Sequence, residues 1–305
     1  MMKIKKQLAA CLAAAASLLS LTGCSHGQAS QPANEITFSL DGITEVTISY
    51  DEENVTFYES DSNQLTIKEY MTENKSSYHA KVDQNRCSIK VSEGGKPLFK
   101  DSFSRYIEVY LPSSYHENLT VTTTDGDIDL SGLELSLNAM RVDSTAGAVR
   151  LNNVEAQDIH LSSTSGSFDA KSLSADTVRI DITSGDFSCT ELNGNVTYTT
   201  TSGDSDIKSA LGSGSYKASN SGKLNIVYTE VTGDLSFFNK NDSIRVTLPA
   251  DLEFEFTATT KNGSISTSFQ EYISVDGRTT RGTVGTHPTV TVQAETTNGD
   301  IEVTQ

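Results

Sequence analysis

A short phrase, Thr-Ser-Gly-Asp or a close variant, recurs about every nineteen residues through the second half of this 305-residue chain. The variants begin at Thr124, Thr145, Thr164, Thr183, Thr201 and Asn220, and Asn-Gly forms stand at Asn262 and Asn298. From Gly126 to Gly222 the glycines are spaced by 21, 19, 19, 18 and 19 residues. A fixed period near twenty is typical of a coil that stacks on itself, not of a globular enzyme core.

The residues around each glycine alternate between apolar and polar. Apolar residues stand seven and five positions before the glycine and two and four after it, as in Leu119, Val121, Ile128 and Leu130 around Gly126. Alternation with a period of two on both sides of a turn predicts two short strands per repeat, each with one buried face. A further apolar column would line the far turn and comprises Leu133, Val154, Leu173 and Leu192.

The glycine column predicts structural turns at Gly126, Gly147, Gly166, Gly185, Gly203, Gly222, Gly263 and Gly299. Asn241-Asp242 fills the slot between Gly222 and Gly263, because Asn and Asp tolerate left-handed backbone angles. Glycine suits such a corner, where a Cβ would clash at positive φ. The Thr hydroxyls are expected to bond along the stack to the Thr of the next rung.

Such a repeat buries its apolar stripe only by stacking on its neighbours, at about 4.8 Å per strand. We therefore predict an all-β fold, a single-stranded β-solenoid (β-helix) with rungs of about 19 residues, two short strands per rung and capped ends. An antiparallel β-sandwich is the alternative, since short strands at even spacing suggest it too. A sandwich gives no reason for one corner sequence to recur in register.

The first thirty residues predict the location of the protein. Three lysines precede an apolar run of fourteen residues, Leu8 to Leu21, which is shorter than the roughly twenty that a spanning helix needs. The run ends in Leu21-Thr22-Gly23-Cys24, which resembles the lipobox of bacterial lipoproteins. The resemblance implies a signal peptide over residues 1–23, a lipid on Cys24 and a protein anchored in the cell membrane at the bacterial surface. An ordinary secretory signal with a chance Cys is the alternative.

The rest of the chain divides by regularity. Residues 24–35 are small and polar, which is typical of a flexible tether. Residues 36–305 form the predicted solenoid, with irregular N-terminal rungs over 36–117, regular repeats over 118–250, and C-terminal rungs with a cap over 251–305. In the last part, Gly277, Gly282, Gly285 and His287-Pro288 indicate a hairpin inserted before the final strand. Atypical ends are expected because a bare terminal rung is an exposed sheet edge.

The charge and the cysteines limit the possible partners. The formal net charge is −17, and removal of residues 1–23 takes away three lysines and no acids, which gives −17 − 3 = −20. Such a surface should not bind nucleic acid or anionic lipid. Cys87 and Cys189 fall in apolar alternation and are expected to be small buried residues. A Cys87–Cys189 disulfide is the alternative.

Two segments carry a family resemblance. They are Ile107-Glu108-Val109-Tyr110-Leu111-Pro112, before the strand of Val121, and Ile244-Arg245-Val246-Thr247-Leu248-Pro249, before that of Phe256. The stretch from Gly277 through Gly285 to Asn298-Gly299-Asp300 adds to them. Over roughly residues 36–305 the chain resembles the bacterial DUF4097 family of adhesin-like proteins. The resemblance implies a β-solenoid and an envelope location, and it implies little about chemistry.

The sequence offers little for catalysis or metal binding. The column after the glycine holds acids on adjacent rungs only at Asp186 and Asp204, which favours solvated turn residues over a catalytic row. The five His have no metal-ligand spacing. We therefore expect no catalytic residue, no cofactor and no metal. Weak Ca²⁺ binding at the Asp-bearing corner stays an alternative, and a β-helical enzyme acting on polysaccharide is a more remote one.

Binding requires less than catalysis. A rod on a lipid tether presents long Thr/Ser-rich faces that suit an envelope protein, a glycan or strand addition. Exposed aromatic residues in a row would indicate sugar stacking, and the candidates are Tyr198, Tyr216 and Tyr228, although Tyr198 falls in an inward column. We predict a non-enzymatic, surface-anchored lipoprotein that binds or scaffolds envelope or extracellular partners, with envelope-stress sensing as the alternative.

Overall fold

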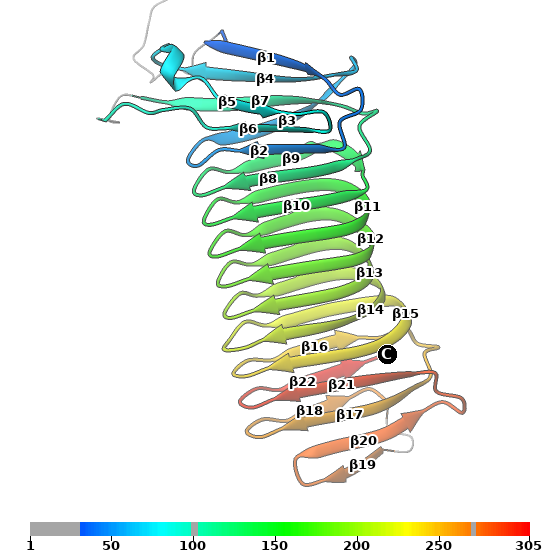
Figure 1. The fold of residues 1–305 in the computed structure, drawn as a ribbon. Coiled ribbons are helices and arrows are strands. Elements are labelled where there is room, and N and C mark those ends of the chain that lie inside the picture. The colour runs from blue at the N-terminus through cyan, green and yellow to red at the C-terminus, as the bar shows by residue number, and fades with distance from the viewer. Residues whose placement is uncertain (1–30, 99–102, 270–272) are drawn as a thin grey trace, which may run out of the picture.

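The computed structural model describes residues 31–98, 103–269 and 273–305, and these fold into stacked β-strands (Figure 1). The described residues contain 22 strands and one short 3₁₀ helix, η1 (Ser76–Tyr78). No helix in this part of the chain is long and apolar enough to cross a membrane. The predicted all-β fold is confirmed. The signal peptide and Cys24 lie outside the described residues.

The middle of the stack is parallel and follows the order of the sequence. Its strands are β8 (Asn118–Thr123), β9 (Ile128–Ser136), β10 (Ala139–Ser144), β11 (Val149–Ser163), β12 (Phe168–Ile182), β13 (Phe187–Thr200), β14 (Ser205–Ala218) and β15 (Leu224–Asn239). From β11 to β15 the two predicted strands of a rung are one long, bent strand. Pairing of β11 with β12 runs from Val149↔Phe168 to Ser163↔Ile182, because the parallel ladder continues around the bend.

The predicted inward columns form one continuous core. The column five residues before each glycine is buried at Val121, Val142, Leu161, Ile180, Tyr198 and Phe237. The apolar residues seven before, two after and four after the glycines, and those of the far-turn column, are buried as well, except for Ile265 near the C-terminal end, which is half-buried. Cys189 is buried as expected. Cys87 is exposed, so its prediction was wrong, and the two thiols form no disulfide. Cys87 lies in a turn, where its N–H donates to Asn85 Oδ1 over 2.9 Å, not on the inward face of a strand.

The N-terminal end departs from sequence order. The first rung, β2 (Glu45–Ser49) and β3 (Asn54–Ser60), lies inside the stack. On one sheet β2 pairs in parallel with both β6 (Ser88–Ser92) and β8, and on the other β3 pairs with both β7 (Arg105–Pro112) and β9. Antiparallel strands close this end, namely β4 (Gln64–Met71) on β7, β1 (Asn34–Ser39) on β4 and β5 (Lys81–Gln84) on β6. Strand β1 therefore includes residues 34 and 35, which the sequence places in the tether.

The C-terminal end shows the same exchange of order. The last strands of the chain, β21 (Val290–Thr296) and β22 (Ile301–Thr304), lie one rung inside the end. Strand β21 pairs with β15 and β17 (Phe254–Thr260), and β22 pairs with β16 (Ile244–Thr247) and β18 (Ile265–Thr267). The C-terminus accordingly lies within the stack in Figure 1. An antiparallel hairpin stands where the sequence predicts one, formed by β19 (Ile273–Asp276) and β20 (Thr279–Val284), and β20 covers β17.

The glycine corners are required by close stacking and not by backbone angle. A Cβ at Gly185 would overlap the carbonyl oxygen of Gly166, and the same holds down the column. Of the eight described column glycines only Gly222 has a positive φ, at 112°, so the expected role of positive φ was wrong for the others. The hydroxyl contacts also differ from expectation. Ser165 and Ser184 donate to the Thr carbonyls of the preceding rung, each over 3.1 Å.

Candidate functional site

The Asp residues that follow the corner glycines hold adjacent rungs together. Asp186 Oδ1 accepts the backbone N–H of Asp204 over 3.0 Å, and Asp204 Oδ1 accepts that of Lys223 over 2.8 Å. At the C-terminal end Asp300 Oδ1 accepts the N–H of Ser264, and this bond lowers the pKa of Asp300. Each carboxylate therefore acts as a structural link between rungs. The described residues contain no group of three or more His, Cys, Asp or Glu placed to hold a metal ion.

The tyrosines proposed from the sequence are not on the surface. Tyr198, Tyr216 and Tyr228 are all buried, and the Tyr228 hydroxyl donates to the Tyr216 hydroxyl over 2.9 Å. Burial raises the pKa of Tyr216 and Tyr228, so both remain neutral. The rings of Tyr198 and Tyr216 belong to a core ladder between Phe187 and Phe237, with centroids 5.3 to 6.2 Å apart.

A different set of tyrosines lies on the outside of the N-terminal end. We call Tyr58 on β3, Tyr106 and Tyr110 on β7 and Tyr70 on β4 the tyrosine face. The register pairs Tyr58 with Tyr110 across β3 and β7, and Tyr106 with Tyr70 across β7 and β4. All four alternate with buried residues of their strands, which places them on the outward side of one sheet. The repeat pattern of the sequence does not reveal this set, because its members come from strands without the regular period.

The rings of the tyrosine face are ordered by stacking. Tyr70 and Tyr106 have centroids 4.4 Å apart and planes within 4°, and Tyr58 and Tyr110 have centroids 5.3 Å apart. Parallel rings on neighbouring strands stand on edge, so this surface presents ring edges and hydroxyl groups. Tyr58 has the most open side chain of the four, with 41% of the residue exposed. Cross-strand aromatic pairs of this kind also stabilise a sheet, by roughly 0.2–1 kcal/mol each.

Glu108 fixes the hydroxyl groups of the face. The phenols of Tyr70 and Tyr110 both donate to Glu108 Oε2, each over 2.9 Å. Burial, followed by these bonds to Glu108, raises the pKa of Tyr110 to about 12 and also raises that of Tyr70. The phenols therefore stay neutral donors at physiological pH. The ammonium of Lys68 lies 4.5 Å from the centroid of the Tyr110 ring, which is within cation–π range.

Buried charges hold the strands beneath the face. Glu69, between Lys68 and Tyr70 on β4, is fully buried and accepts hydrogen bonds from Tyr50, Asn34 and the Ala80 N–H. Arg105, next to Tyr106, pairs with Glu53 and Glu93 over 2.8 Å each and donates to the Tyr78 carbonyl over 2.7 Å. Because these buried groups are hydrogen-bonded and paired, they fix the geometry of β3, β4 and β7.

The regular rungs offer no comparable aromatic surface on the same sheet. The outward row that contains Glu108 continues through polar and charged side chains, namely Asp129, Arg150, Asp169, Ser188, Asp206 and Asn225. Polar outward positions are the usual composition of a solvated sheet face. The tyrosine face is thus a local departure at one end of the stack.

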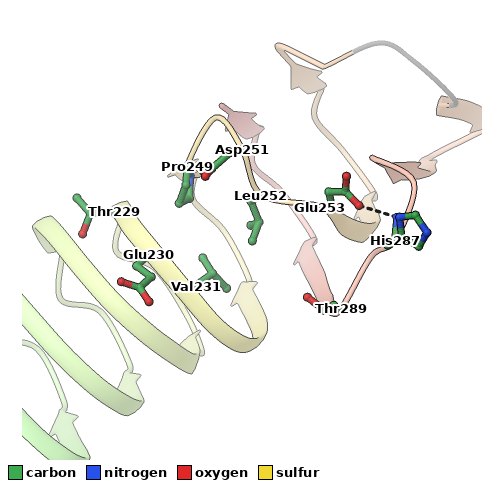
Figure 2. Close-up of a pocket in the computed structure, with 9 residues that line it drawn as sticks. All are labelled: Thr229, Glu230, Val231, Pro249, Asp251, Leu252, Glu253, His287 and Thr289. Carbon is green, nitrogen blue, oxygen red and sulfur yellow. Dashed lines mark hydrogen bonds between the residues drawn. The ribbon is translucent and has the colours of Figure 1, made fainter.

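A groove of about 550 Å³ lies near the other end, between β15 and the loops that precede β17 and β21 (Figure 2). Its lining is mainly polar, with the acids Glu230, Asp251 and Glu253. Glu253 accepts the backbone N–H of His287, as Figure 2 shows, and also that of Thr286, and so ties the two loops together. The groove therefore lies where two loops meet, and the contacts of Glu253 there hold these loops together.

The chain is similar to solved structures and matches the model of one protein family. Two crystal structures, each described as a "putative adhesin", come from Parabacteroides distasonis and Bacteroides fragilis. They share 14% and 11% identity with this chain, with TM-scores of 0.43 and 0.38, and the alignments cover 88% of this chain and 96% of each of those chains. A comparison with curated proteins finds no match. The model of the Toastrack DUF4097 family matches residues 43–304, which is most of the stack, and the chain therefore belongs to that family.

Proposed function

We propose that this protein is a lipid-anchored, non-enzymatic binding protein of the bacterial surface. Cys24 carries the anchor, the β-stack is the rigid body, and the outward faces meet partners in the envelope or beyond it. The observation that carries the proposal is the tyrosine face, because ordered, partly exposed aromatic side chains are typical of binding surfaces.

The contacts of the corner acids support the non-enzymatic part of the proposal. The acids that the sequence offered for catalysis, Asp186 and Asp204, are engaged with backbone N–H groups of the next rungs. A carboxylate in that role is a poor candidate for a general acid or base. Binding needs only a stable surface, and the stack supplies one.

The anchor and the binding are tested separately. A Cys24→Ala chain should move from the membrane fraction to the medium, while a neighbouring Ser25→Ala chain should stay in the membrane fraction. The full-length chain in detergent should co-sediment with the insoluble envelope material of its own cells or with foreign surface material, and it should release no soluble sugar. Retention of Cys24→Ala in the membrane would contradict the anchor. Failure to sediment with either material, or release of sugar, would contradict the binding function.

A further inference from the structure

We infer that the tyrosine face binds a neutral polysaccharide of the cell's own envelope. The inference rests on the proposed function and names the site and the ligand class. It is built from the chemistry of the four rings, from the charges around them, and from the position of the face relative to the predicted anchor.

The face offers two kinds of contact that suit a pyranose ring. Phenol hydroxyls held on Glu108 form a fixed row of hydrogen-bonding groups for sugar hydroxyls. Tyr58 stands at the β9 side of this row, and the β3–β9 pairing ends at Thr56↔Asp129. The register of β9 is irregular between Leu130 and Glu134, and beside it Tyr58 keeps 41% of the residue exposed. The exposed part of its ring is available to the apolar face of a sugar.

The charges around the face favour a neutral ligand. One outward row of this sheet holds three acids, Glu35, Glu108 and Asp129, and one base, Lys68. The excess of negative charge in this row and the net charge of −17 both disfavour binding of anionic polymers. A cationic ligand would seek the electron-rich ring faces. However, Lys68 already lies over the Tyr110 ring, which is stacked on the ring of Tyr58, so its positive charge opposes a second cation at this pair of rings. A neutral polyol does not meet this repulsion.

The length of the tether favours a ligand in the cell's own envelope. Residues 24–33, ten in number, separate the predicted anchor from the start of β1 at Asn34. A fully extended chain covers at most about 3.6 Å per residue, so the tether spans no more than about 36 Å. The tyrosine face is built on β3, β7 and β4, and β4 is the direct neighbour of β1. The face is thus held near the membrane, below most of the stack.

The test measures binding of the full-length chain in detergent to two materials. One is an array of neutral oligosaccharides of glucose, mannose, galactose and N-acetylglucosamine, with sialylated and sulfated forms as charged comparators. The other is insoluble polysaccharide purified from the protein's own cells, compared with that of an unrelated bacterium. We expect binding to neutral sugars and preference for the cell's own polysaccharide. We expect Tyr58→Ala to weaken the binding to neutral sugars and to the cell's own polysaccharide by at least about tenfold, which corresponds to about 1.4 kcal/mol.

Two control variants separate the role of the ring from general damage. Tyr58→Phe keeps the ring and should bind within about twofold of the wild type. Phe238→Ala removes a half-buried outward aromatic on the other sheet and should leave binding unchanged. Equal binding by wild type and Tyr58→Ala, binding to charged sugars alone, or preference for the foreign polysaccharide would overturn the inference. If Tyr58→Ala sediments with envelope material as well as the wild type does, the proposed binding function stands and the inferred site is wrong. If the wild type does not sediment at all, both the proposed function and the inferred site are wrong.

Discussion

The middle of this stack and its two ends are built by different rules. From β8 to β15 the rungs follow one another in sequence and pair only in parallel. At each end a rung is inserted out of order, β2–β3 at one end and β21–β22 at the other, and antiparallel strands close the stack. A repeating pattern can extend a solenoid but cannot end it, because every rung leaves an unpaired edge. The irregular ends solve that problem, and one of them carries the aromatic surface.

The largest effect should come from deleting residues 289–305. In a stack that followed sequence order, this deletion would expose only the preceding rung. Here β21 and β22 separate β15–β16 from β17–β18, so their loss leaves strands on both sides unpaired. We expect residues 244–269 and 273–284 to lose protection in hydrogen exchange, while β11–β13 remain protected. Protection of β17 that survives the deletion would contradict the inserted order.

A smaller but still severe effect is expected at a corner of the middle region. In Gly185→Ala the new Cβ would overlap the Gly166 carbonyl, which is backbone and cannot rotate away. We expect a loss of about 4 kcal/mol or more in the free energy of unfolding, measured by chemical denaturation. Gly132→Ala is the matched control near the N-terminal end, because its Cβ would lie 3.4 Å from the nearest atom, the Phe57 carbonyl. A similar loss in both variants would show that stacking distance is not the cause.

The smallest effect concerns the ionisation of tyrosines in the two regions. Tyr110, at the end, has its pKa raised to about 12 from 10.0 by burial and by Glu108. Because its folded pKa lies above the unfolded value, its contribution to stability is complete below pH 10 and is lost as the pH rises through about 12. Burial raises the pKa of Tyr216, in the middle, well above its ordinary value. The absorbance at 295 nm reports tyrosine ionisation, and the difference between the wild type and Tyr110→Phe isolates the signal of Tyr110. We expect Tyr110 to ionise in the folded protein and Tyr216 to ionise only when the protein unfolds. Ionisation of both near pH 10 would contradict the assigned environments.

Sequence reasoning was strongest where the chain repeats. The inward columns through Val121 and Ile128 and the corner at Asn241-Asp242 could be found, because alternation and spacing are local properties. The stacking role of the glycines was not visible, since the atom that excludes a Cβ is a backbone carbonyl oxygen of another rung. The exposure of Cys87 was missed because a turn begins at Asn85, so Cys87 does not continue the alternation of Ile89 and Val91.

The candidate site was the least predictable part. Tyr198, Tyr216 and Tyr228 stood out in the repeats, but the repeat itself turns them inward. The tyrosine face joins residues 58, 70, 106 and 110 through one parallel and one antiparallel pairing. The alternation within each strand could have suggested that these side chains point outward. It could not show that the three strands are neighbours.

By itself, the sequence determined the strands, their inward faces, the corner column and the family, because each depends on residues a few positions apart. The tertiary structure decided the order of rungs at both ends, the antiparallel caps and the assembly of the tyrosine face. Those features depend on register between residues up to 73 positions apart in the sequence, as in the pairing of Val46 with Leu119. Such pairings are selected by the burial and hydrogen bonding of the whole stack, and no local pattern encodes them.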